Sequence, residues 1–546
     1  MSDILPESAQ DDNKGFYSSV KSDLKRAVKL EKARNLIFLG ICFGLVFIIY
    51  SQSLFGGFVY DDRSIVEHYE IFKDINNIGK VVLMPYWNVE AGLYRPTTLL
   101  SYLFNYSFFG QGAWSFHLFN LICYGLTCYL IFLFIKNLFL SERIGYLTAL
   151  LFLVLPIHTE AVANIVGRAE ILALLFSLLV FLELIKEKPC LWKTGLWFLL
   201  ALGSKETAIA VLPIALLIIF FKKGSGKITV LRREGKFKEY FYNVAFLIFA
   251  AASYFIARFL VLGDNFFTNS ASIVENPLKF VHWPQRIATA LKITAMYVGK
   301  SFVPINLCSD YSYKQVAIVG FSNWQAIAGF LILLFFALGI IIFLGRAPVL
   351  SIAFSFFLFS FLVTSNLLMP IGTIAGERLV YFPSLGLCLF LAWGLIAIGR
   401  LNSSKISGIF SLVLSGILIF SYAGISFARS FVWLNEERLF ISAAKCAPNS
   451  VLSVSNLGTL YYFSGDYEKA QQIFLEANAI YDGYSKAINN LGLVYWKKKE
   501  YNKAKEYFFK ALMATHPYSG AIENLFLMAL SRGREAEAER WREIFY

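Results

Sequence analysis

Two adjacent carboxylates lie directly after the first long apolar run of the chain. They are Asp61 and Asp62, within the stretch GGFVYDDRSIVEH. A carboxylate within hydrogen-bonding distance of a hydroxyl can take its proton and so act as a general base. Two like charges side by side raise the pKa of one of them, which would leave one base and one orienting partner. The sequence does not assign these two roles, and it also allows an ordinary solvated turn.

A second set of charged and polar residues recurs at the ends of later apolar runs. Charges near membrane depth cost several kcal/mol unless they pair with one another or face a wet cavity. Each one alone is more often a structural ion pair or a span-end residue, whereas their gathering on one membrane side predicts a single outward-facing cavity. The set consists of Arg95, His158, Glu160, Arg168, Lys205, Glu206, Asp310, Glu377 and Arg378.

The elements that must hold these residues are membrane helices. Of the 546 residues, 57% are hydrophobic, 17% aromatic and 16% charged, and the mean hydropathy is +0.58, which is typical of a polytopic membrane protein. The net charge of +13 lies largely in short loops, as membrane topology requires, so we predict no nucleic-acid partner. The seven cysteines are scattered singly, so we interpret them as membrane-core residues and predict no disulfide.

Eleven apolar segments are predicted to span the membrane. The first follows a basic leader without an A-x-A cleavage site, so we expect an uncleaved signal anchor. Some segments are shorter than the ~20 residues of a straight crossing, which makes the number of spans approximate. The segments are 35–55, 117–136, 144–157, 168–185, 191–203, 206–221, 240–262, 321–344, 347–369, 379–399 and 406–428.

Basic residues orient these spans, because cytoplasmic loops carry the excess of Lys and Arg. The loop Lys222–Glu239 holds seven of them and is therefore placed in the cytoplasm. This threading puts the N-terminus inside and puts Asp61, Asp62, the polar set and everything after residue 428 outside. The run 287–304 contains two lysines and would break the parity if it crossed. We therefore interpret it as a re-entrant or interfacial helix.

The C-terminal region 429–546 is charged and carries an internal repeat. Asn456, Asn490 and Asn524 each begin an Asn-Leu pair, and alanines follow the same 34-residue period. A 34-residue period with L-G-x-x-Y and A-x-x-x-F is typical of the tetratricopeptide repeat, or TPR. Small residues in this pattern let paired helices pack closely. Residues 436–448 are predicted to form a half repeat, and the third repeat is degenerate, as a terminal cap would be.

An ordered set of motifs resembles one enzyme family. The acidic pair is followed by YRPTTLLSYLFNYSFFG, WSFHLFNL, PIHTEAVANIVGRAEILA, SKETAI, PINLCSDYSY and GERLVYFPSLG, and then by the repeats. This order is similar to that of the transmembrane and TPR-containing O-mannosyltransferases and their bacterial relatives, which are GT-C class glycosyltransferases. His158 is a candidate because the family motif carries a histidine there. The resemblance implies an all-α fold: a basic segment 1–34, a GT-C-type helical bundle 35–428 and a TPR α-solenoid 429–546.

The resemblance also implies a reaction. A sugar, with mannose as the family default, passes from a polyprenyl-phosphate carrier to a hydroxyl of a protein or glycan acceptor on the extracytoplasmic face, with inversion. The first-loop acidic motif, which holds the family's catalytic carboxylate, maps onto Asp61 and Asp62. The basic residues Arg168, Lys205 and Arg378 become candidates for the lipid phosphate, because charge-assisted contacts stabilise a phosphate leaving group.

The sequence leaves several points open. We expect no required cofactor; paired carboxylates can bind a divalent cation, but we predict no obligatory metal. The repeats either present a polypeptide acceptor, bind a protein partner or stabilise the membrane domain. A non-catalytic scaffold or a transporter of lipid-linked saccharides is the alternative function. The terminus WREIFY carries no retention signal, so a bacterial inner membrane is favoured over the endoplasmic reticulum.

Overall fold

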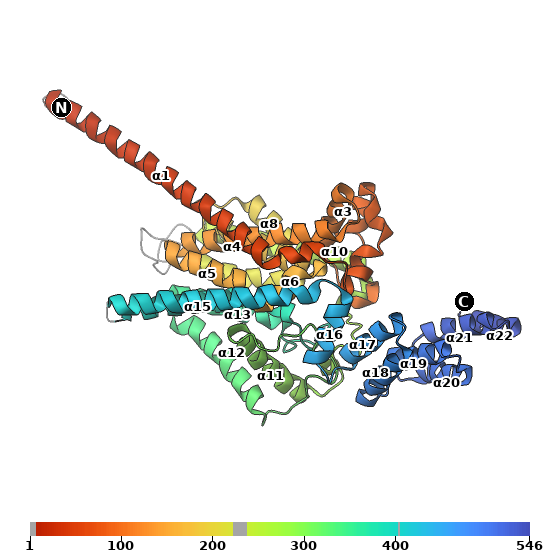
Figure 1. Cartoon of the computed structure of the whole chain (residues 1–546). Coiled ribbons are helices and arrows are strands. Elements are labelled where there is room, and N and C mark those ends of the chain that lie inside the picture. The colour runs from red at the N-terminus through yellow and green to blue at the C-terminus, as the bar shows by residue number, and fades with distance from the viewer. Residues whose placement is uncertain (1–6, 222–236, 402–403, 546) are drawn as a thin grey trace.

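The computed structural model describes residues 7–221, 237–401 and 404–545, and within these ranges every regular element is a helix. Apolar helices form a bundle, and a row of shorter helices extends from one end of it to the C-terminus (Figure 1). The two termini lie at opposite ends of the molecule in this view. The predicted all-α membrane bundle with a C-terminal solenoid is confirmed.

Each of the eleven predicted spans coincides with a helix. Six of these helices contain a window of apolar residues long enough to cross a bilayer, when the short helical turns that adjoin some of them are included. They are α1, α4, α7, α10, α12 and α15. Helix α5 and the segment Pro156–Ala163, which includes α6 (Thr159–Ala163), are bent by 54° and form either a broken seventh span or a re-entrant loop. The bounds are α1 Glu7–Tyr50, α4 Ala113–Phe139, α5 Glu142–Val154, α7 Arg168–Leu184, α8 Leu191–Ser204, α9 Val211–Phe220, α10 Phe237–Leu262, α12 Trp324–Ile342, α13 Pro348–Thr364, α14 Ser384–Gly399 and α15 Lys405–Ser430.

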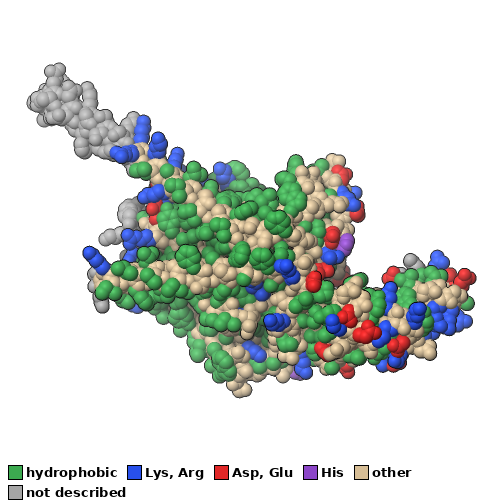
Figure 2. Space-filling view, viewed as in Figure 1, with side chains coloured by type: hydrophobic (Ala, Val, Ile, Leu, Met, Phe, Trp, Pro, Cys, Tyr) green, Lys and Arg blue, Asp and Glu red, His purple; other side chains and the backbone are tan. Residues whose placement is uncertain are grey.

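The other apolar helices are too short to contain such a window. The topology with eleven crossings therefore stays a prediction. Most of the predicted cytoplasmic loop Lys222–Glu239 lies outside the described residues, as do residues 1–6 and 402–403. Apolar side chains cover the bundle, whereas Lys, Arg, Asp and Glu gather over the C-terminal helices (Figure 2). This distribution is the one that a bilayer around the bundle and water around the repeats would select.

Helix α11 (Trp283–Phe302) contains the run that was predicted to be re-entrant or interfacial. It packs along α12, and a stripe that includes Ala288, Leu291 and Thr294 is buried while its opposite face is more exposed. Its residues are not apolar enough to give a spanning window. The helix is therefore amphipathic, as an interfacial helix must be.

The C-terminal solenoid begins with α16 (Glu436–Cys446), the predicted half repeat. Three helix pairs follow it. They are α17 Val451–Phe463 with α18 Tyr467–Ile480, α19 Ser485–Lys497 with α20 Tyr501–Met513, and α21 Gly520–Ser531 with α22 Glu535–Phe545. A Cβ atom at Gly458 would lie 2.8 Å from the Phe474 ring, and one at Gly492 would lie 2.6 Å from the Phe508 ring. The small residues of the repeat therefore allow the close pairing that the period predicted.

The prediction that the cysteines form no disulfide is wrong for one pair. Cys308 and Cys446 are bonded, with their Cα atoms 5.7 Å apart, and they join the segment after α11 to the end of α16. They are 138 residues apart in the sequence, so their spacing gave no sign of the pairing. Cys42, Cys123 and the other cysteines are free, and most are buried as expected.

Candidate active site

Asp62 is the inner member of the acidic pair. It is completely buried, and its Oδ2 accepts a hydrogen bond from the Val59 backbone N–H at 3.3 Å. Its Oδ1 accepts a second one from the Val166 backbone N–H at 2.9 Å, directly before α7. Burial raises the pKa of Asp62 to about 7, although both hydrogen bonds oppose the rise. Asp62 therefore ties the first loop to the start of α7.

Asp61 is the outer member and is only partly buried. Its carboxylate makes no hydrogen bond or ion pair with any described side chain or backbone group. Burial raises the pKa of Asp61 to about 6; Glu160 adds to the rise, while Arg378 opposes it. The residue before the pair, Tyr60, has a φ of 53°, a conformation that is rare for a residue with a side chain. Asp61 is thus a carboxylate with free acceptor capacity beside a cation.

Three ion pairs lie at the same end of the bundle. The Arg378 side chain pairs with Glu160 through Nη1, and the Arg378 backbone N–H donates to the same carboxylate at 3.0 Å. Lys205 pairs with Glu170, and both side chains are buried. The third pair, between Arg95 and Glu206, spans 2.9 Å.

The electrostatic influence of these groups on one another places them in a single polar cluster. Burial lowers the pKa of Lys205; Glu170 opposes this, and the cations Arg95 and Arg378 add to it. Burial also acts to lower the pKa of Arg378, but the carboxylates of Glu160 and Asp61 outweigh it and raise that pKa. The sequence-predicted cations Arg95, Lys205 and Arg378 therefore act on one another, and Arg378 also acts on Asp61.

Arg378 is the most accessible cation of this cluster. Its side chain is 30% exposed, against 14% for Arg95 and 8% for Lys205. Nη1 is the one side-chain nitrogen of Arg378 that bonds a described residue. The remaining N–H groups of its guanidinium are free to bind an anion.

The geometry disfavours the predicted phosphate contact of Arg168. Its side chain is completely buried. All five N–H groups are used: Nε on Asn120, Nη1 on Ser101, and Nη2 on Asn105 and the Phe116 carbonyl. No donor remains for a ligand, so Arg168 holds α3 (Pro96–Phe109), α4 and α7 together.

His158 has a similar structural environment. It is completely buried, with Nδ1 3.1 Å from the Tyr124 hydroxyl and Nε2 2.7 Å from the Ser384 hydroxyl. Its ring centroid lies 4.3 Å from that of Phe152 and 4.8 Å from that of Tyr381. Both ring nitrogens are therefore engaged within the bundle, and this geometry disfavours the predicted substrate contact.

Asp310 and Glu377 hold the segment around Cys308 against the solenoid and the bundle respectively. Asp310 Oδ2 accepts hydrogen bonds from Ser312, Ser450 and Ser453, the last two at the start of α17. Buried Glu377 pairs with Arg429 at 3.1 Å, and it also accepts the Cys308 backbone N–H and the Tyr311 hydroxyl. Both carboxylates are saturated: Asp310 ties the segment after α11 to the first repeat, and Glu377 ties the same segment to α15.

The sequence analysis missed three residues that surround the candidate site. Arg429 lies near the end of α15 and balances Glu377; a lone arginine after an apolar run was a usable signal. The Tyr86 ring lies 4.8 Å below the Arg95 guanidinium, and Glu275 adds to the raised pKa of Asp61. Nothing in the local sequence around these last two residues marked them.

No group of three His, Cys, Asp or Glu side chains in the described part of the chain is arranged to hold a metal ion. The absence of an obligatory metal stays a prediction. So does the outward-facing cavity, because the 750 Å³ cavity described below lies at the opposite end of α7.

Comparisons with known proteins give this geometry a context. Residues 99–257 match the family described as dolichyl-phosphate-mannose-protein mannosyltransferase, and residues 453–482 and 485–515 match the tetratricopeptide repeat. The first match covers Glu160, Glu170, Lys205 and Glu206, but not the acidic pair.

Curated relatives carry a related name. Human protein O-mannosyl-transferase TMTC3 is 26% identical over 486 residues, which cover 82% of this chain and 52% of the relative. Mouse protein O-mannosyl-transferase TMTC4 is 27% identical over 470 residues, with 75% and 62% covered. Drosophila melanogaster protein O-mannosyl-transferase Tmtc3 is 25% identical over 544 residues, with 85% and 58% covered. The chain thus spans between half and two thirds of the length of these relatives. With its mannosyltransferase-type segment followed by tetratricopeptide repeats, the chain resembles the transmembrane and TPR-containing O-mannosyltransferases of the GT-C class, as its motifs predicted.

Proposed function

We propose that this chain is an integral-membrane glycosyltransferase. It moves mannose from a polyprenyl-phosphate carrier to a hydroxyl of a protein or glycan acceptor on the extracytoplasmic face. The single observation that carries the proposal is the free carboxylate of Asp61 beside the accessible guanidinium of Arg378. The names of the relatives support the sugar and the reaction class.

Asp61 supplies the base. Its carboxylate accepts the proton of the acceptor hydroxyl while the hydroxyl oxygen attacks the anomeric carbon of the sugar. The bond between that carbon and the carrier phosphate oxygen breaks on the opposite side, so the configuration inverts. A pKa of about 6 keeps Asp61 ionised near neutral pH and still basic enough to take a proton. Buried Asp62 fixes the loop that carries it.

Arg378 stabilises the leaving group. The carrier phosphate is a diester with one negative charge before transfer, and it gains a second charge as the sugar leaves. Preorganised donors aimed at such a developing charge typically contribute about 10²–10³-fold in rate. Glu160 orients Arg378 through Nη1 and the backbone, which leaves the other N–H groups for the phosphate. Lys205 and Arg95 lie in the same cluster, but each is already paired with a carboxylate, so Arg378 is the cation left for the phosphate.

The disulfide supports an extracytoplasmic location. Cys308 and Cys446 lie next to Glu377 and the start of the repeats, and structural disulfides persist in oxidising compartments. Both the bacterial periplasm and the lumen of the endoplasmic reticulum are oxidising, so the preference for a bacterial inner membrane rests on the sequence alone. In either compartment the repeats would lie beside the reaction centre, where they can present a polypeptide.

The donor can be tested directly. Permeabilised membranes that contain the full chain receive radiolabelled mannose either on polyprenyl phosphate or on a nucleotide, and label is counted in the protein and glycan fractions. We expect label from the lipid donor alone, and we expect it to persist with a chelator. The exposed carboxylate Glu67 lies outside the polar cluster. The Glu67→Gln variant is therefore the matched control for substitution of Asp61, and it should keep the activity. Labelling from the nucleotide sugar would contradict the proposed carrier, and no chain-dependent label from either donor would favour the scaffold or transporter alternative.

A further inference from the structure

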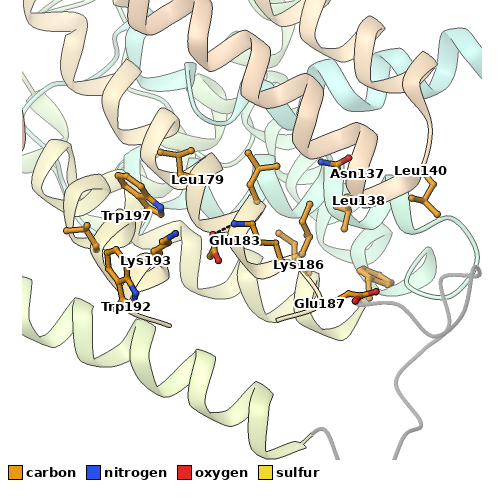
Figure 3. Close-up of a pocket in the computed structure, with 15 residues that line it drawn as sticks. Asn137, Leu138, Leu140, Leu179, Glu183, Lys186, Glu187, Trp192, Lys193 and Trp197 are labelled. Carbon is orange, nitrogen blue, oxygen red and sulfur yellow. Dashed lines mark hydrogen bonds and ion pairs between the residues drawn. The ribbon is translucent and has the colours of Figure 1, made fainter. Parts of the chain in front are cut away.

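A cavity of about 750 Å³ is lined by residues at the C-terminal end of α7 (Figure 3). The polar cluster lies at the other end of this helix, where Glu170 pairs with Lys205. The cavity is formed by the last residues of α4, α7 and α9 and the first residues of α8. Glu183 on its wall comes fifteen residues after Arg168, which is about 22 Å along a helix axis. The cavity and the polar cluster are therefore separated by most of the thickness of a bilayer core.

The wall of this cavity is apolar and aromatic. Leu179, Leu182 and Leu196 line it together with Trp192 and Trp197. Tryptophan is enriched at the interface between lipid tails and water, and Trp192 is 60% exposed. The leucines offer a surface for an acyl chain, while the indoles mark the level at which a headgroup would lie.

The charges at the rim leave one cation unpaired. Glu183 accepts the Lys186 ammonium at 2.5 Å and the Cys190 backbone N–H at 3.0 Å, so its carboxylate is occupied. The Lys193 ammonium lies 5.5 Å from the centre of the Trp192 ring. It acts electrostatically on the Glu183 carboxylate but forms no direct ion pair with any described residue. Glu187 is also on the rim, but it lies well away from Lys193 and Trp192 (Figure 3).

An unpaired ammonium beside two indoles and a leucine wall suits one kind of ligand. A free inorganic anion would use the lysine but not the leucines, and a neutral apolar molecule would use the leucines but not the lysine. A lipid with a negatively charged phosphate headgroup uses both. The positive-inside threading places this end of the bundle in the cytoplasmic leaflet, where anionic lipids attract basic residues.

We propose that this cavity binds an anionic phospholipid of the cytoplasmic leaflet, with its phosphate at Lys193 and an acyl chain along Leu179, Leu182 and Leu196. The site is separate from the proposed reaction centre and does not depend on the proposed transfer. One lysine near an anionic lipid surface contributes about 1 kcal/mol, which corresponds to a fivefold change in binding. The preference should therefore be modest and specific to this lysine.

The test is lipid retention by the full chain. The purified protein is equilibrated with phosphatidylglycerol or phosphatidylcholine of identical acyl chains, and bound lipid is counted by native mass spectrometry. We expect about fivefold more phosphatidylglycerol retained, and we expect Lys193→Gln to remove that preference. Lys188→Gln is the matched control, because Lys188 is exposed in the loop directly before α8 but does not line the cavity; it should keep the preference.

Three results would overturn the proposal. Equal retention of the two lipids would show that the headgroup is not recognised. Equal loss in Lys188→Gln and Lys193→Gln would indicate a general surface charge rather than this cavity. Displacement of the bound lipid by glycerol phosphate at millimolar concentration would identify a soluble phosphate as the ligand, because the acyl chain would then contribute nothing.

Discussion

Arg168 and Arg378 are both arginines at the same end of the bundle, but their environments differ. Arg168 is buried and donates all of its N–H groups to neutral oxygens, with no carboxylate among them. Arg378 is partly exposed and bonds one carboxylate through a single side-chain nitrogen. A saturated buried charge stabilises one arrangement of helices and has nothing left for a ligand. The unsaturated one can take part in chemistry.

The acidic pair repeats this contrast within two residues. Asp62 is buried and accepts two backbone N–H groups, whereas Asp61 is half-buried and keeps its acceptor capacity. Both have a raised pKa because of burial, to about 7 and about 6 respectively. Hydrogen-bond saturation, more than the pKa, therefore distinguishes Asp62 from Asp61, the proposed base.

The largest effect is expected at the saturated arginine. Arg168→Met would leave the buried oxygens of Asn120, Asn105 and Phe116 without a donor, and each such loss costs about 1–3 kcal/mol. We expect a loss of about 3–5 kcal/mol in the free energy of unfolding, seen as poor yield and a lower unfolding temperature in detergent. Arg438→Met, at an exposed arginine, is the control and should change stability by less than about 0.5 kcal/mol. Equal stability of the two variants would contradict the structural role assigned to Arg168.

The unsaturated arginine should affect the rate instead. Arg378→Gln alone would leave Glu160 buried without its cation, so the informative variant is Arg378→Gln with Glu160→Gln, in which two amides can bond each other. We expect near-normal thermal unfolding and a fall in kcat/KM for mannose transfer of about 10²–10³-fold. Normal transfer by a stable double variant would exclude Arg378 from the leaving-group step.

The disulfide between Cys308 and Cys446, like the saturated arginine, is expected to act on stability and not on the reaction. Replacing Cys308 and Cys446 with serine should lower the free energy of unfolding by about 2–4 kcal/mol, because the crosslink restricts the unfolded chain. The rate per folded molecule should stay close to that of the unchanged chain. The check is thermal unfolding with and without reductant, which should shift the unchanged chain and leave the serine variant unaffected. A shift of equal size in both proteins would mean that reductant acts elsewhere.

The pH dependence of transfer gives the smallest but most local effect. The folded-state pKa of Asp61 is raised to about 6, so the base is protonated below that pH and ionised above it. We expect kcat/KM to fall about tenfold for each pH unit below 6 and to level off above about 7. The measurement is a rate profile between pH 4.5 and 8, limited to pH values at which the chain stays folded. A flat profile across pH 6 would contradict the assignment of the base.

Local sequence patterns predicted the elements well. Apolar runs of sufficient length must become helices in a bilayer, and all eleven coincide with helices. The 34-residue period predicted the solenoid because each repeat needs the same small residues at the same contacts, as Gly458 and Gly492 illustrate.

Hydrogen-bond and disulfide partners were not predictable from local patterns, because the partner residues lie far away in the sequence. The Asp62 carboxylate accepts the Val166 N–H from 104 residues away, and Cys308 bonds a cysteine 138 residues later. The motif that contains Arg168 pointed to a phosphate contact. In the structure Arg168 instead donates hydrogen bonds to neutral side chains and backbone carbonyls, which no charge pattern reveals. For the same reason the sequence could place Asp61 and Asp62 at the site and could not assign their roles.

The most direct test compares the two aspartates in mannose transfer from radiolabelled polyprenyl-phosphate mannose by the full chain. We expect Asp61→Asn to unfold at the normal temperature and to lose about 10²–10⁴-fold in kcat/KM, because the general base is gone. Asp62→Asn should lower the unfolding temperature and keep far more activity per folded molecule. Transfer at the normal rate by Asp61→Asn, or a greater loss of rate in folded Asp62→Asn, would contradict the assignment of Asp61 as the base.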